Sequence, residues 1–163
     1  MASDAYLKIE GIGGESEDSG HQGWIEVNNV VYAINQPRAD TVSTAGGMTT
    51  GRAELHPIAF QKLTDIASPV LLQTCAAGKT IPKATFEFMR ADGDGKPIPY
   101  FRIELENLII ANITPNSGDG GIICERVNLA FAKIKWAYTK QSIRGGVQGK
   151  TAGGWDCSAN KVC

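Results

Sequence analysis

Hydrophobic and polar residues alternate with a period of two along much of the chain, which is typical of strands with one buried face. In the segment AYLKIEG, residues 5–11, the set Ala5, Leu7 and Ile9 falls on one face and the set Tyr6, Lys8 and Glu10 on the other. The run WIEVNNVVYAINQP, residues 24–37, is rich in β-branched and aromatic residues. We expect these two strands to pair across the acidic loop GGESEDSGHQG, residues 13–23.

A long hairpin is predicted for residues 83–110, KATFEFMRADGDGKPIPYFRIELENLII. In its first strand Ala84, Phe86 and Phe88 alternate with Thr85, Glu87 and Met89, and in its second Phe101, Ile103 and Leu105 alternate with Arg102, Glu104 and Glu106. Its turn is ADGDGKP, residues 91–97.

The last predicted strand, residues 124–139, contains two apolar sets that are out of phase. These sets are Val127, Leu129 and Phe131, and then Ile134, Trp136 and Tyr138. A bulge near Lys133 would keep both sets on the buried face.

Residues 56–69, HPIAFQKLTDIASP, carry Ile58, Leu63 and Ile66, with Phe60 nearby, at a spacing that predicts an amphipathic helix beginning at Pro57. A second, short helix is expected to begin with Ser68 as N-cap and to end at Gly78. Before both, residues 38–54 hold almost no large apolar side chain and predict an extended loop.

The sequence Gly78-Lys79-Thr80 resembles the end of a phosphate-binding loop, but the resemblance fails on two counts. The first glycine of G-x-x-x-x-G-K-[ST] would stand at Gln73, and the expected helix precedes the Gly-Lys-Thr instead of following it. We therefore expect Gly78 to be a helix cap and no nucleotide to bind there.

Composition indicates one domain, residues 1–163, with a Gly-rich tail at about residues 144–163. The 16 basic and 17 acidic residues leave no charge excess for nucleic acid or a membrane surface. No signal peptide or membrane-length apolar run is expected, which favours synthesis in the cytoplasm. The four cysteines show no metal-ligand spacing and are expected to be reduced, although Cys157 and Cys163 could oxidise outside the cell.

No residue cluster indicates catalysis, a cofactor or a metal. Asp92–Lys96 lacks the Glu that a calcium loop needs at its twelfth position, which is Ile103. His21 and His56 lie 35 positions apart, and a Cys-His pair would need Cys75 or Cys124 to meet one of them in space. We therefore predict that the protein is not an enzyme.

The outward faces of the predicted strands carry a regular polar lining of mixed sign. Its members are Glu26, Asn28, Arg102, Glu104, Glu106, Arg126 and Asn128. Such a lining suits a solvated sheet face, and it also suits the wall of a water-filled pore.

Several segments, in order, resemble the Hcp family, the tube protein of the bacterial type VI secretion system. The segments are AYLKIEGIGGESEDSGHQGWIEV, FQKLTDIASPVLLQTCAAGKTIPKATFEFMR, ERVNLAFAKIKWAY and the closing GGWD. The resemblance implies a mainly β fold, in which two packed antiparallel sheets form a barrel with one flanking α-helix, and six copies close into a ring.

The resemblance also implies that rings stack into a tube inside a contractile sheath, capped by a VgrG-type spike, with effector proteins in the lumen. The tube is assembled in the cytoplasm and then secreted. We expect the ring-stacking loop to include Thr41, Val42, Ser43, Thr44, Met48, Thr49 and Thr50. The expected lumen-facing residues are Glu26, Asn28, Glu104, Arg126 and Asn128.

Two other hypotheses fit the pattern of strands. A phage tail-tube subunit shares the architecture, and a stand-alone β-sandwich could bind a ligand such as a carbohydrate through exposed aromatic residues. For the second, Trp24 and Trp136 are expected to be buried, which leaves Trp155 available.

Overall fold

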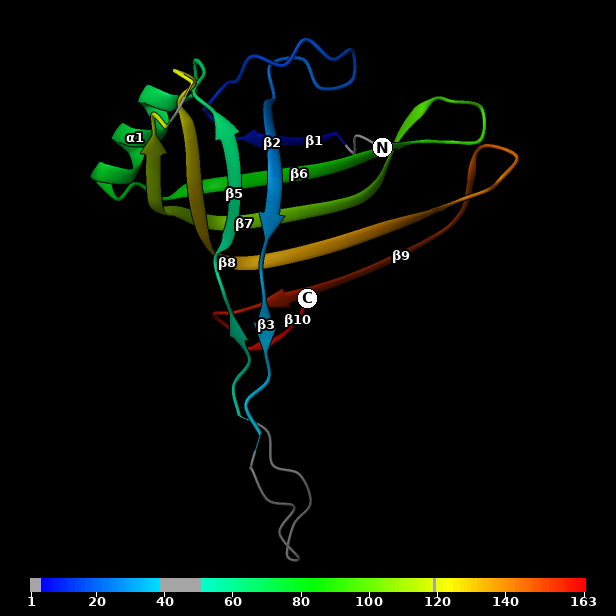
Figure 1. Cartoon of the computed structure of the whole chain (residues 1–163). Coiled ribbons are helices and arrows are strands. Elements are labelled where there is room, and N and C mark those ends of the chain that lie inside the picture. The colour runs from blue at the N-terminus through cyan, green and yellow to red at the C-terminus, as the bar shows by residue number, and fades with distance from the viewer. Residues whose placement is uncertain (1–3, 39–50, 119) are drawn as a thin grey trace, which may run out of the picture.

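Strands dominate the computed structural model, which describes residues 4–38, 51–118 and 120–163 (Figure 1). The strands are β1 (Ala5–Ile9), β2 (Ile25–Val31), β3 (Ile34–Asn35), β4 (Glu54–Leu55), β5 (Ile58–Leu63), β6 (Ile81–Ala91), β7 (Pro97–Asn116), β8 (Cys124–Gln141), β9 (Val147–Asp156) and β10 (Lys161–Val162). The one helix of the described residues, α1, spans Ser68–Ala77.

Six antiparallel strands close into a barrel. Their order is β8-β5-β2-β1-β6-β7, and β7 pairs again with β8. The strands β9 and β10 continue the sheet from the second half of β8, and β3 pairs with β4 in a separate ribbon. The predicted mainly β barrel with a flanking helix is confirmed, as are the pairing of β1 with β2 and the long hairpin β6–β7.

The strands β7 and β8 bend sharply and so belong to two walls of the barrel (Figure 1). We call the sheet of β1, β6, β9, residues 97–106 and residues 133–141 the long wall, and the sheet of β2, β5, residues 108–116 and residues 124–131 the cross wall. In Figure 1, β2 and β5 cross the strands of the long wall.

The predicted bulge near Lys133 is wrong. The buried face of β8 does change between Leu129 and Ile134, but β7 changes its buried face at the same level, at Asn107, whose φ is 50°. The two strands turn together, so their register runs without a shift from Phe101–Tyr138 to Ile110–Leu129. The irregularity in this ladder lies further along, between Ile110 and Asn112.

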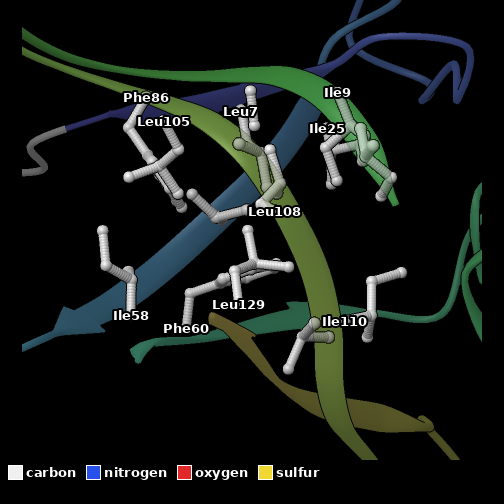
Figure 2. Close-up of a cluster of buried hydrophobic side chains, with 14 of the residues drawn as sticks. Leu7, Ile9, Ile25, Ile58, Phe60, Phe86, Leu105, Leu108, Ile110 and Leu129 are labelled. Atoms are coloured by element: carbon white, nitrogen blue, oxygen red, sulfur yellow. The ribbon is translucent and has the colours of Figure 1, made fainter. Parts of the chain in front are cut away.

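The core lies between the two walls and is almost entirely aliphatic and aromatic (Figure 2). Its largest fully buried side chains include Phe60 of the cross wall and Phe86 of the long wall. Their rings meet nearly edge to face, with centroids 5.7 Å apart and planes at 73°. This contact joins the walls through the favourable geometry of aromatic pairs.

The helix predicted for residues 56–69 is wrong, because residues 58–63 form strand β5. Ile58, Phe60 and Lys62 alternate into the barrel, whereas Leu63 and Ile66, which the helical spacing required to be buried, are 56% and 64% exposed. A charged residue occupies the third inward position because a carboxylate lies opposite it on β8. Because Lys62 stands where an apolar residue would be expected, the alternation of a strand could not be recognised in the sequence of this segment.

The flanking helix is the short one, α1, and it ends as predicted. Gly78 has φ 62°, in the left-handed region, and its N–H donates to the carbonyl of Cys75. The N-cap is Ala67 rather than the predicted Ser68, because the Ser68 hydroxyl is engaged by buried charges. The Gly-Lys-Thr segment thus follows a helix, as expected for a cap.

The predicted turn of the long hairpin is confirmed. The backbone N–H groups of Asp94 and Lys96 each donate to Oδ1 of Asp92 at 2.9 Å. The carboxylate is therefore satisfied by the turn itself, as is common for Asp in this position.

Candidate functional surfaces

The outer face of the long wall carries charges of alternating sign, and we call it the charged face. Lys83 stands opposite Glu106, Glu106 opposite Lys133, and Lys133 opposite Asp156 on successive strands. The face also includes Lys8, Glu10, Arg102, Glu104 and Lys135. Because neighbours across the ladder have opposite signs, the face presents many charges and little net field.

Ion pairs connect these side chains within a strand and between strands. Arg102 Nη2 lies 3.2 Å from Glu104 Oε1 on the same strand, β7, and Lys133 Nζ of β8 lies 3.4 Å from Glu106 Oε2 of β7. Both pairs are partly exposed, so each contributes only modestly to stability. Their main consequence is a solvated and nearly neutral wall.

The five residues predicted to face the lumen lie on two different walls. Glu104 belongs to the charged face of the long wall. Asn28 and Arg126 lie on the outer face of the cross wall, where each stands opposite Gln61. Asn128 is half-buried on the same wall, and Glu26 lies on β2, opposite Tyr6 of β1. The structure therefore separates Glu104 from the other candidates. The predicted ring-stacking residues of 41–50 lie outside the described residues.

His21 holds the acidic loop of residues 13–23 against the long wall. Its ring is 3% exposed and stacks on Tyr6, with centroids 4.3 Å apart. Its Nδ1 lies 2.7 Å from Asp18 Oδ2, and its Nε2 lies 2.6 Å from Glu87 Oε2. Each ring nitrogen thus faces a carboxylate oxygen, one in the loop and one on β6. With both nitrogens engaged, His21 is not placed to activate a cysteine.

The hydrogen bond from His21 lowers the pKa of Asp18, against an opposing effect of burial. A carboxylate whose pKa is lower in the folded state stabilises that state above its unfolded pKa of about 3.9, and the contribution is lost as pH falls through the lowered value. We therefore expect Asp18→Asn to lower the free energy of unfolding at neutral pH, and the gap from the wild type to close below about pH 4. Urea unfolding from pH 7 to pH 2 measures this.

The matched background for that prediction is His21→Phe, which keeps a ring on Tyr6 and removes the donor. In this background the pH-dependent effect of Asp18→Asn should be smaller, because the largest cause of the lowered pKa is gone while the backbone N–H of Gly20 still donates to the carboxylate. A stability gap between the wild type and the Asp18→Asn variant that stays constant down to pH 2 would contradict the assignment.

A buried ionic network closes the barrel end beside α1. The side chain of Lys62 is 0% exposed and that of Glu125 is 2% exposed, and Lys62 Nζ lies 2.7 Å from Glu125 Oε2. Lys62 Nζ also lies 2.9 Å from Asp65 Oδ1 and donates to Ser68 Oγ at 2.9 Å. Ser68 in turn donates to Glu125 at 3.0 Å, and Thr64 donates to it at 3.2 Å. The network fixes β5, β8 and the start of α1 to one another.

All four cysteines are free thiols. The register places Gly154 beside Cys163 and Asp156 opposite Lys161, so Cys157 and Cys163 are separated by about three positions of the ladder, roughly 10 Å. This exceeds the reach of a disulfide without backbone movement. Burial raises the pKa of the Cys157 thiol.

Among the described residues, the aromatic and metal-ligating side chains indicate no separate ligand site. Trp24, Trp136 and Trp155 are all half-buried, so neither the expected burial of the first two nor the expected availability of the third is complete. Trp136 and Trp155 pack against the core. In the part of the chain that the structure describes, no three His, Cys, Asp or Glu side chains are grouped to hold a metal ion.

The His21 clamp and the Lys62 network were both missed from the sequence. The acidic loop was recognised, but nothing in it showed that Glu87, 66 positions away, completes the clamp. Lys62 could have been recognised, because Lys62 and Glu125 both fall on the inward-facing positions of their strands. The two residues are direct partners where β5 pairs with β8.

Comparison with known proteins gives consistent results along the chain. The family model described as "Type VI secretion system effector, Hcp" matches residues 6–138. The curated "Protein hcp1" of Pseudomonas aeruginosa is 28% identical over 162 residues, covering 98% of each chain. The "Major exported protein" of the same organism is 27% identical and covers 89% of this chain and 94% of the relative.

Solved structures are similar over their whole length. One described as "Structure of a type six secretion system protein" has a TM-score of 0.91 at 25% identity and covers 99% of this chain and all of that one. The crystal structure of Hcp1 from Salmonella typhimurium has a TM-score of 0.79 at 32% identity, with full coverage of both chains. The one helix of the described residues, α1, is not long and apolar enough to cross a membrane.

Proposed function

The chain belongs to the Hcp family of type VI secretion system proteins, and from this premise we propose that six copies close into a hollow ring. Rings then stack into the inner tube, which a contractile sheath expels. The observation that carries the proposal is the combination of a family match over residues 6–138 with a barrel whose long wall extends beyond its closed part.

The energetics of ring closure favour assembly. A closed ring needs a heterologous contact, in which two different surfaces of each copy meet. If each copy buried about 1,500 Å² in its contacts, hydrophobic burial at ~25 cal/mol/Å² would give a gross gain of tens of kcal/mol. The cost of association is about 4–15 kcal/mol. Stacking between rings through polar segments would be weaker, which suits a tube that must form and then fall apart.

The partners of the proposed tube are a VgrG-type spike at its tip, the sheath around it, and effector proteins in its lumen. We propose that the charged face of the long wall lines this lumen. Alternating signs keep the wall solvated and give it little net field, so a folded cargo of either charge slides along it without being held. On this assignment Glu104 faces the bore, whereas Asn28 and Arg126 face away from it.

Rings provide the test of both statements. Native mass spectrometry of the purified chain is expected to show a six-copy species, and negative-stain images are expected to show an annulus. In a background with the four cysteines replaced by serine, a bulky maleimide should label Glu104→Cys more slowly in rings than in dissociated subunits, and Arg126→Cys nearly equally in both. A monomer at all accessible concentrations would reject the ring, and equal labelling at position 104 would reject the lumen assignment alone.

A further inference from the structure

One border of the long wall is strongly acidic. Residues 4–26, which form β1, the following loop and the start of β2, hold six carboxylates and one lysine, Lys8. The carboxylates are Asp4, Glu10, Glu15, Glu17, Asp18 and Glu26. All except the half-buried Asp18, which binds His21, are exposed, and we call this set the acidic border.

The opposite border is basic. Residues 140–163, which form the end of β8 and all of β9 and β10, hold four cations and one carboxylate, Asp156. The cations are Lys140, Arg144, Lys150 and Lys161, and all four are exposed. We call this set the basic border. The whole chain has a formal charge of only −1, so its charges are segregated between the two borders rather than in excess.

The two borders lie on opposite sides of the sheet. The strand order of the long wall is β1-β6-β7-β8-β9, which places β1 at one side and β9 at the other. In Figure 1 the acidic loop, in blue, lies at the top, and β9 and β10, in red, lie below the other strands of the long wall.

The basic border also contains an unpaired strand edge. On its outer side β9 pairs with β10 only at Trp155 and Asp156, and Cys163 donates to the carbonyl of Gly154. No strand of the described chain covers residues 147–153 on that side. A free edge of this length exposes backbone donors and acceptors, and native proteins usually cover such an edge.

We propose that the acidic border of one copy docks on the basic border of the next, and that this contact closes the ring. The inference rests on the proposed function, which requires two different complementary surfaces on each copy. Opposite charge at opposite sides of one sheet meets that requirement and disfavours a two-fold contact, because each border would then face its own sign. The acidic loop of the neighbour also covers the free edge of β9.

Charge reversal at exposed positions tests the pairing. One variant carries Glu10→Lys, Glu15→Lys and Glu17→Lys, which changes the net charge of the acidic border from −5 to +1, and the other carries Lys150→Glu and Lys161→Glu, which changes that of the basic border from +3 to −1. Each variant has two borders of the same sign, so its ring contact should weaken at least tenfold relative to the wild type. Native mass spectrometry should therefore find subunits at concentrations where the wild type forms rings.

Mixing the two variants gives the decisive result. In an alternating ring every contact again joins an acidic and a basic border, so an equal mixture should recover six-copy rings with three copies of each variant. Labelling one variant with nitrogen-15 resolves this composition. In the wild type, raising the salt from about 0.05 to about 0.5 M should weaken rings, because exposed charges are screened.

Controls separate this inference from the function on which it rests. Lys79→Glu with Arg126→Glu reverses two exposed cations outside both borders and should leave rings intact. If a reversed variant fails to fold by circular dichroism, Glu15→Gln with Glu17→Gln replaces it and should weaken rings less strongly. Rings from either folded variant alone, or no rings from the mixture, would overturn the border pairing while leaving the tube function in place. A wild type without rings would overturn both.

Discussion

Replacing Lys62 with alanine is expected to lower the free energy of unfolding by about 3–5 kcal/mol, because the change leaves a buried carboxylate without its partner. Glu125 is 2% exposed and lies 2.7 Å from the lysine nitrogen, so it has no access to bulk water that could replace the ammonium. Asp65 loses the same cation at 2.9 Å. Urea unfolding at neutral pH, compared with the exposed Lys79→Ala as control, measures the loss.

The double variant Lys62→Met with Glu125→Leu distinguishes an unpaired charge from lost packing. Replacing both members of a buried pair by apolar residues of similar size is often neutral or stabilising, so the double variant should be more stable than Lys62→Ala. If it is as unstable as the single variant, the loss comes from packing or from Ser68 and Asp65, and the role given to the pair is wrong.

The sequence was sufficient for β1, β2, β6, β7 and β8 because their alternation is regular. It missed β9 and β10, which lie in the segment predicted as a Gly-rich tail at residues 144–163, because glycines there interrupt the apolar pattern. It failed at β5, where Lys62 takes an inward position that an aliphatic residue would ordinarily hold. Without knowledge of Glu125, the apolar residues of that segment fit a helix better than a strand. The bend at Asn107 was hidden for a related reason, since a coordinated change of face on two paired strands cannot be seen in either strand alone.

The candidate surfaces depend more strongly on pairing than on local pattern. Polar outward residues could be recognised from the sequence, but their assignment to the long wall or the cross wall required the strand order. The alternation of charge along Lys83, Glu106 and Lys133 exists only across strands, so no continuous segment of the sequence contains it.

The acidic border is different, because its residues are close in sequence. The acidic loop was noted from the sequence, but its relation to the basic border needed the positions of β1 and β9 in the sheet.

Phe86→Ala is expected to cost about 3–5 kcal/mol of stability, because Phe86 is fully buried and its ring joins the two walls. Phe88 is the matched control: it lies on the same strand and the same face but is half-buried, so Phe88→Ala should cost about 1–2 kcal/mol.

A double-mutant cycle of Phe60→Ala and Phe86→Ala should give a coupling of about 0.5–1.5 kcal/mol from their edge-to-face contact. Because Phe86 is buried inside the barrel whereas the charges of the borders lie at exposed positions, the folded fraction of Phe86→Ala should still form rings. Equal losses at positions 86 and 88 would mean that the barrel interior relaxes around the missing ring, and that the walls do not depend on this contact.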